Sequence, residues 1–157
     1  MTSREQQTAR TGTARGVGVL LAGLALALWI VFGRFLFGVG GELTVAYLLI
    51  GVLVLVLHIF IARALARTAS RGFTVRSSTR GTLIAAWGCG ILLGLTIPDI
   101  TTEGMQTIIS GTQQPALDVA IGVANPAGII MIALTIIALV LASQDANGPR
   151  PSEDEDF

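Results

Sequence analysis

Apolar residues along this chain gather into four long runs that are separated by polar stretches. The runs cover about residues 17–37, 43–62, 82–97 and 116–142. Because roughly 20 helical residues cross a hydrocarbon core, each run predicts a membrane-spanning helix, with the third short and the fourth long. The pattern predicts an all-α fold, an integral membrane four-helix bundle. Its outer connector is short between spans one and two and longer between spans three and four.

The two ends of the chain differ from the runs in polarity. We expect residues 1–16 to form a disordered N-terminal arm and residues 143–157 a disordered acidic tail. Between them, residues 17–142 form the transmembrane domain. The first run is longer than the apolar core of a signal peptide, so we expect an uncleaved span.

Composition agrees with a membrane protein and argues against soluble enzymes. Hydrophobic residues make up 52% of the 157 residues and charged residues only 13%. The mean hydropathy is +0.75. All ten basic residues are arginine, which we interpret as the codon bias of a GC-rich bacterial genome. Nothing in this composition indicates a nucleic-acid partner.

The positions of the arginines predict how the chain is threaded. Three precede the first run, one lies at the membrane edge after the second, and four lie before the third: Arg4, Arg10, Arg15, Arg63, Arg67, Arg71, Arg76 and Arg80. The connectors at 38–42 and 98–115 hold no basic residue. By the positive-inside rule, the protein is a multi-pass protein of the cytoplasmic membrane with both termini cytoplasmic. Arg34 lies near the outer end of the first run, where we expect it to reach the headgroups with Glu42 as its neighbour.

The arginines between the second and third runs are also candidate binding residues. A helical extension of the second run would align Arg63, Arg67 and Arg71 on one face, because they recur every four residues. We therefore expect membrane lipids with anionic headgroups as partners of Arg63, Arg67, Arg71, Arg76 and Arg80. The alternative is that these arginines only set the topology.

Asn125-Pro126-Ala127 interrupts the fourth run with a polar amide and a helix breaker. The same tripeptide lines the aquaporin pore, but there it occurs twice and a selectivity arginine accompanies it. Asn125 and Pro126 are better explained as a helix kink or cap, because proline bends a helix and asparagine caps one. We expect one continuous kinked helix, with two helical pieces as the alternative.

Few residues in the runs offer chemistry. His58 is the single histidine, and we expect it to face the bundle interior. Cys89 is the single cysteine, with no acid or histidine beside it. We expect no catalytic residue, no metal site and no cofactor. Small residues recur on the first, third and fourth runs and predict close helix packing, either within the chain or with a protein partner or second copy: Gly23, Ala27, Ala86, Gly90, Gly94, Ala120, Ala124 and Gly128.

The layout of arginine-containing start, arginine loop and acidic tail, with the segment AWGCGILLGLTIPD at residues 86–99, resembles uncharacterised small four-span membrane proteins of GC-rich Gram-positive bacteria. This resemblance implies no activity. We expect a non-enzymatic accessory or scaffold protein of the bacterial cytoplasmic membrane. The alternative is a small transporter or channel subunit that lines a polar path with His58, Thr96, Asn125 and Thr135.

Overall fold

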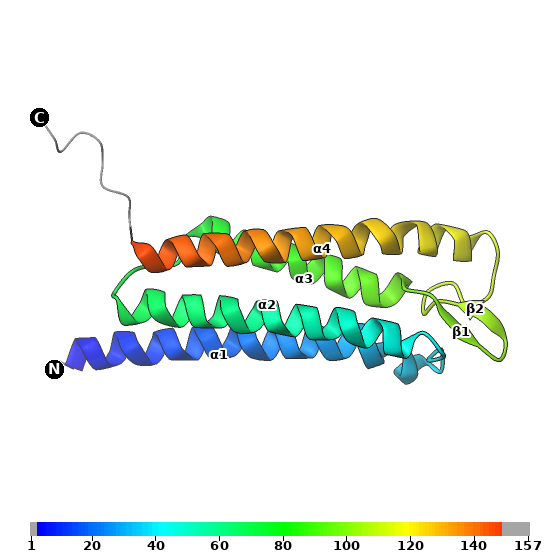
Figure 1. The fold of residues 1–157 in the computed structure, drawn as a ribbon, viewed down its shortest axis with the longest axis horizontal. Helices are drawn as coiled ribbons and strands as arrows, with labels where there is room; N and C mark the ends of the chain where they lie inside the picture. The colour runs from blue at the N-terminus through cyan, green and yellow to red at the C-terminus, as the bar shows by residue number, and fades with distance from the viewer. Residues whose placement is uncertain (1–2, 149–157) are drawn as a thin grey trace, which may run out of the picture.

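Four long helices make up most of the chain, and each contains most of one of the four apolar runs. The computed structural model describes residues 3–148, with side chains placed from residue 14 onward. The helices are α1 (Ser3–Phe32), α2 (Thr44–Ser70), α3 (Ser77–Thr96) and α4 (Ala116–Asn147), drawn in Figure 1. A short 3-10 helix, η1 (Gly33–Phe37), continues α1. Between α3 and α4, strands β1 (Asp99–Thr101) and β2 (Gly104–Gln106) form an antiparallel hairpin.

The helices pack as two consecutive pairs. α1 packs along α2 and α3 along α4, while α2 also contacts α4 and α1 also contacts α3. The start of α1, the α2–α3 loop and the end of α4 share one end of the molecule, and the β-hairpin lies at the other (Figure 1). We call the first the arginine end, after Arg63, Arg67, Arg71, Arg76 and Arg80, and the second the hairpin end.

Three segments within the described residues are long and apolar enough to cross a membrane: Ala14–Phe37, Thr44–Ser70 and Ala116–Asn147. They indicate a membrane protein. The predicted third span is helical within α3, but α3 does not reach the same hydropathy. Its first turn, Ser77 to Arg80, is polar, and this turn takes up part of a helix of only 20 residues.

The outer and inner faces of the helices differ in the size of their side chains. Large apolar residues are exposed on every helix, among them Leu21, Leu49, Ile84 and Ile129. The predicted small-residue stripes lie inside the chain instead, with Gly128 half-buried and the others buried: Gly23, Ala27, Ala86, Gly90, Gly94, Ala120 and Ala124. These stripes therefore form contacts between helices of the same chain, which is one of the two kinds of packing that the sequence predicts.

Close helix contact explains why some of these positions are glycine. A Cβ atom at Gly90 would lie 2.8 Å from the side chain of Leu26 and 2.9 Å from that of Met131. Such separations are shorter than van der Waals contact, so a larger residue would require the side chains of Leu26 and Met131 to shift.

The ends of the helices differ from the sequence expectation. α1 begins at Ser3, so residues 3–16 are helical and not a disordered arm. Glutamate, glutamine, alanine and arginine in this stretch favour helix and extend it from the apolar part. At the other end, α4 continues past residue 142 to Asn147 and stops at Gly148, which has a positive φ of 86°. The rest of the predicted tail, residues 149–157, lies outside the described residues.

Candidate functional site

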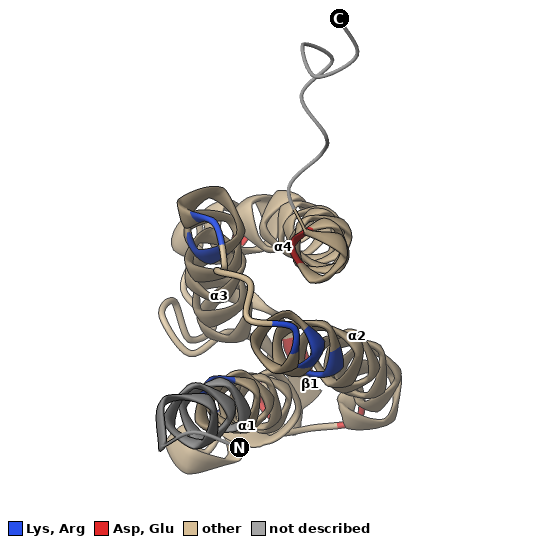
Figure 2. Cartoon of the chain, turned by 90° about the vertical axis from the view of Figure 1, so that its left-hand side faces the viewer, with Lys and Arg blue, Asp and Glu red and all other residues tan. Residues whose placement is uncertain are grey.

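Charged side chains gather at the arginine end. α2 continues beyond the predicted span to Ser70, and Arg63, Arg67 and Arg71 are exposed along and just after this extension. Arg76 and Arg80 are exposed at the start of α3. Figure 2 looks onto this end and shows blue arginine segments on α2 and α3, with a red acidic segment on α4.

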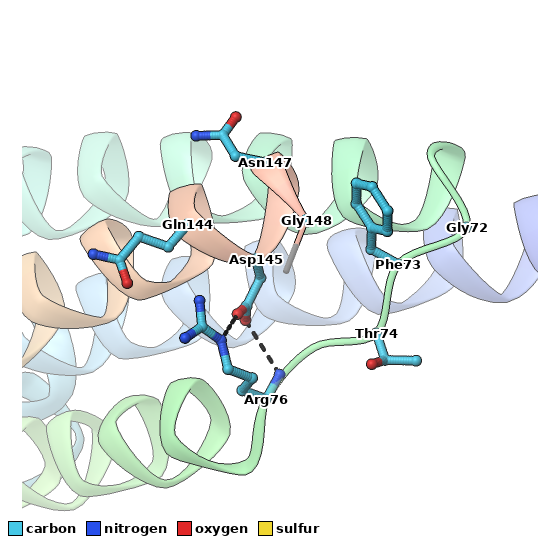
Figure 3. A pocket seen from close by; sticks show the side chains of 8 residues that line it. All are labelled: Gly72, Phe73, Thr74, Arg76, Gln144, Asp145, Asn147 and Gly148. Carbon is cyan, nitrogen blue, oxygen red and sulfur yellow. Dashed lines mark hydrogen bonds and ion pairs between the residues drawn. The ribbon is translucent and has the colours of Figure 1, made fainter. Parts of the chain in front are cut away.

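Asp145 near the end of α4 binds the start of α3. Its carboxylate is fully buried and forms an ion pair with the guanidinium of Arg76. The same carboxylate accepts hydrogen bonds from the backbone N–H of Arg76 at 3.2 Å and from the Thr79 hydroxyl at 2.7 Å. Figure 3 shows Asp145 and Arg76 facing one another across the two elements. Charge-assisted hydrogen bonds of this kind are stronger than neutral ones.

This contact replaces an ordinary helix cap. Arg76 is the N-cap residue of α3, with extended backbone and no capping hydrogen bond from its own side chain. Helix N-termini leave N–H groups unpaired and carry partial positive charge. The Asp145 carboxylate supplies both an acceptor and a negative charge at this position, so α4 caps α3.

The α2–α3 loop is bound to α4 at two further points. The Arg71 guanidinium donates to the carbonyl of Ala146 at 2.8 Å. The ring of Phe73 packs so closely on Gly148 that a Cβ atom there would lie 2.7 Å from it. A pocket of about 950 Å³ lies between loop and helix (Figure 3), lined by Gly72, Phe73, Thr74, Arg76, Gln144, Asp145, Asn147 and Gly148.

The five candidate lipid-binding arginines therefore divide into two groups. Arg71 and Arg76 are hydrogen-bonded to α4, although half of the Arg76 side chain remains accessible, at 53%. Arg63, Arg67 and Arg80 are exposed and form no ion pair with any residue between 14 and 148. Within residues 14–148, the second group therefore presents positive charge that no acidic side chain pairs with.

His58 lies in the interior, as expected, and its polar atoms are satisfied by protein groups. It is fully buried, with Nδ1 2.8 Å from the Val54 carbonyl and Nε2 3.0 Å from Nε1 of Trp87. Because the tryptophan nitrogen can only donate, Nε2 is the acceptor and Nδ1 carries the proton. His58 also packs on Gly23, so it joins α2 to both α1 and α3.

The structure does not bring the residues of the predicted polar path together. Thr96 and Thr135 are buried, and each hydroxyl donates to a carbonyl one turn earlier in its own helix. Asn125 is exposed on the outside of α4, whereas His58 is buried inside. α4 runs without a break through Pro126, so it is one helix, as expected, and not two helical pieces.

Arg34 is paired differently from the prediction. It is fully buried, and its guanidinium lies 2.9 Å from the carboxylate of Asp99, which is also fully buried. The guanidinium carbon lies 4.1 Å from the ring centroid of Tyr47, a cation–π contact. The expected neighbour, Glu42, is exposed. Asp99 follows the end of α3 and lies beside η1. The separation of Arg34 and Asp99 along the chain does not predict this contact.

Asp99 also orders the backbone around it. Its two carboxylate oxygens accept hydrogen bonds from the N–H groups of Gly41, Leu43 and Ile100 at 2.8–2.9 Å. The Tyr47 hydroxyl donates to the neighbouring carbonyl of Pro98 at 2.7 Å. Both carboxylate oxygens of Asp99 are therefore bound to protein groups. This cluster joins the α1–α2 connector to the hairpin and has a structural role.

Comparison of the chain with known protein families, with curated proteins and with solved structures returned no match. The geometry of the arginine end is therefore the basis for the proposed function. Sequence reasoning missed Asp145 there, because it lies next to the acidic tail and reads as part of it. The available signal was Arg76 itself, an N-cap residue whose side chain supplies no cap, so that an acceptor has to come from elsewhere in the chain.

Proposed function

We propose that the protein is a non-enzymatic accessory or scaffold protein of the bacterial cytoplasmic membrane. Its four helices cross the membrane as a bundle, including α3, and both termini face the cytoplasm. The arginine end then lies at the cytoplasmic surface. There it binds anionic lipid headgroups and holds the α2–α3 loop ready for contact with other membrane components.

One observation carries this proposal. Arg63, Arg67 and Arg80 are exposed, and no acidic residue between 14 and 148 pairs with them. The buried Asp145 is already occupied by Arg76 and Thr79. Beside this charge, the helices expose apolar side chains such as Leu21 and Val140. Positive charge next to an apolar surface matches a lipid headgroup layer above a hydrocarbon core.

The threading is tested with single cysteines in a Cys89→Ala background. An impermeant thiol reagent should label a cysteine at Thr112 in intact cells, but cysteines at Ser77 and Ser152 only after permeabilisation. Ser77 and Thr112 flank α3, so opposite labelling of the two requires that α3 crosses the membrane. Labelling of Ser77 in intact cells would contradict the proposed topology.

The lipid contact is tested by counting anionic lipids that stay bound to the purified full chain. Each arginine near a charged surface contributes about 1 kcal/mol, which is roughly fivefold in affinity. A triple Arg63→Gln, Arg67→Gln, Arg80→Gln variant should therefore retain far less phosphatidylglycerol than wild type. The matched control replaces the same three residues by lysine, which keeps the charge. Equal retention by the glutamine and lysine variants would contradict headgroup binding.

A further inference from the structure

Asn125 lies on the outside of the molecule, in the part of α4 that faces lipid. It is the single exposed residue with a polar side chain on α4 between Asp118 and Gln144. Its amide makes no hydrogen bond to any described residue. Pro126 has no N–H group, so the carbonyl of Gly122 lacks the donor that it would have in a regular helix. The donor and acceptor of the Asn125 amide therefore lie beside a carbonyl that has lost its regular helical donor.

The depth of Asn125 makes this arrangement costly in lipid. The helical rise places Asn125 about 10 Å from Asp118 along α4 and about 28 Å from Gln144. A hydrocarbon core of about 30 Å, centred between these polar ends, would place Asn125 about 6 Å inside its outer edge. Water cannot satisfy polar groups freely at that depth, so a protein partner stabilises them.

We propose that α4 is the interface of a homodimer, in which Asn125 of one copy hydrogen-bonds Asn125 of the other. An amide both donates and accepts, so two copies related by a two-fold axis along the membrane normal complement each other. The axis also places the two amides at the same depth in the membrane. A different partner would need a polar side chain of its own at that depth. This inference rests on the membrane-spanning arrangement proposed above.

The neighbouring residues allow the close approach that such a pair needs. A Cβ atom at Gly122 would meet nothing within 4 Å, so this glycine is not required by the packing of its own chain. It lies one turn from Asn125, on the same exposed face. Ile129, Ala133 and Ile136 continue that face toward the arginine end and provide apolar contact.

The test is single-molecule photobleaching of the labelled full chain in vesicles, over a series of protein-to-lipid ratios. Interhelical hydrogen bonds contribute about 0.6–2 kcal/mol in membranes, so Asn125→Leu should weaken dimerisation about 3- to 30-fold. Gly122→Leu should also weaken it, because the new side chain separates the two helices. Asn125→Gln keeps the amide and should dimerise like wild type.

A matched control separates the interface from general effects of a larger residue. Gly18→Leu places the same side chain at an exposed glycine of α1 that also has nothing within 4 Å, and it should leave dimerisation unchanged. A wild-type chain that stays monomeric at all densities overturns the inference. So does an Asn125→Leu or Gly122→Leu chain that dimerises as wild type does.

Alkaline extraction of the same membranes keeps the two proposals apart. If the chain remains in the membrane and is monomeric, only the dimer is wrong. If the chain is extracted, the membrane-spanning proposal fails and the dimer with it.

Discussion

Removal of the Asp145 carboxylate should detach the start of α3 from the end of α4. Asp145→Ala deletes the ion pair with Arg76 and the hydrogen bonds from the Arg76 N–H and the Thr79 hydroxyl. Asp145→Asn keeps the shape but loses the charge. The Asp145 side chain itself is fully buried, so both variants remove a contact inside the fold.

The magnitude follows from the groups left behind. Loss of a helix cap costs about 0.5–2 kcal/mol, and a buried hydroxyl without a partner costs about 1–3 kcal/mol. Loss of the ion pair with Arg76 adds little to this cost, because half of the Arg76 side chain is accessible and its guanidinium can be hydrated instead. We therefore expect Asp145→Ala to lower the free energy of unfolding by about 2–4 kcal/mol. Asp145→Asn should cost about 1–2 kcal/mol, and Arg76→Ala less than about 1 kcal/mol.

Unfolding in mixed micelles, followed by far-ultraviolet circular dichroism, measures these differences. Amide hydrogen exchange provides the local readout, because the N–H groups of the first turn of α3 should exchange faster in Asp145→Ala while those of α1 do not. A Thr79→Val variant tests the shared contact, and its effect should not add fully to that of Asp145→Asn. Stability of Asp145→Ala within 0.5 kcal/mol of wild type, on the order of a neutral surface change, would refute the capping role.

Two further predictions concern buried contacts. Gly23→Ala places a methyl group against the ring of His58, well inside van der Waals contact, and should destabilise the fold by about 1–3 kcal/mol. Gly18→Ala, with nothing within 4 Å, is the matched control and should be neutral or stabilising in the same unfolding assay. Asp99→Leu should cost about 4 kcal/mol or more, because Arg34 is left charged and buried with one remaining acceptor, the Val31 carbonyl. Arg34→Met should cost less, since Asp99 keeps its three backbone donors, and a reversed order would contradict this account.

The sequence predicted the helices because their signal is local. Runs of about 20 apolar residues bounded by arginine or acidic residues fix where α1, α2 and α4 lie, whatever surrounds them. The burial of His58 and of the small-residue stripes was also predictable. Large apolar residues suit lipid, whereas glycine and alanine allow helices to approach closely. The prediction of a disordered N-terminal arm was wrong, because helix propensity between Glu5 and Arg15 extends α1 beyond its apolar part.

Tertiary structure alone decided which charged groups meet. Arg34 and Asp99 are 65 positions apart, and Asp145 lies 69 positions from Arg76. An ion pair depends on a few ångströms of separation, so the packing of α3 against its neighbours selects the partner and chain proximity does not. The same holds for Asn125. Its sequence context indicated a bend, but only the packing of α4 determined that its amide faces outward, where a second copy can reach it.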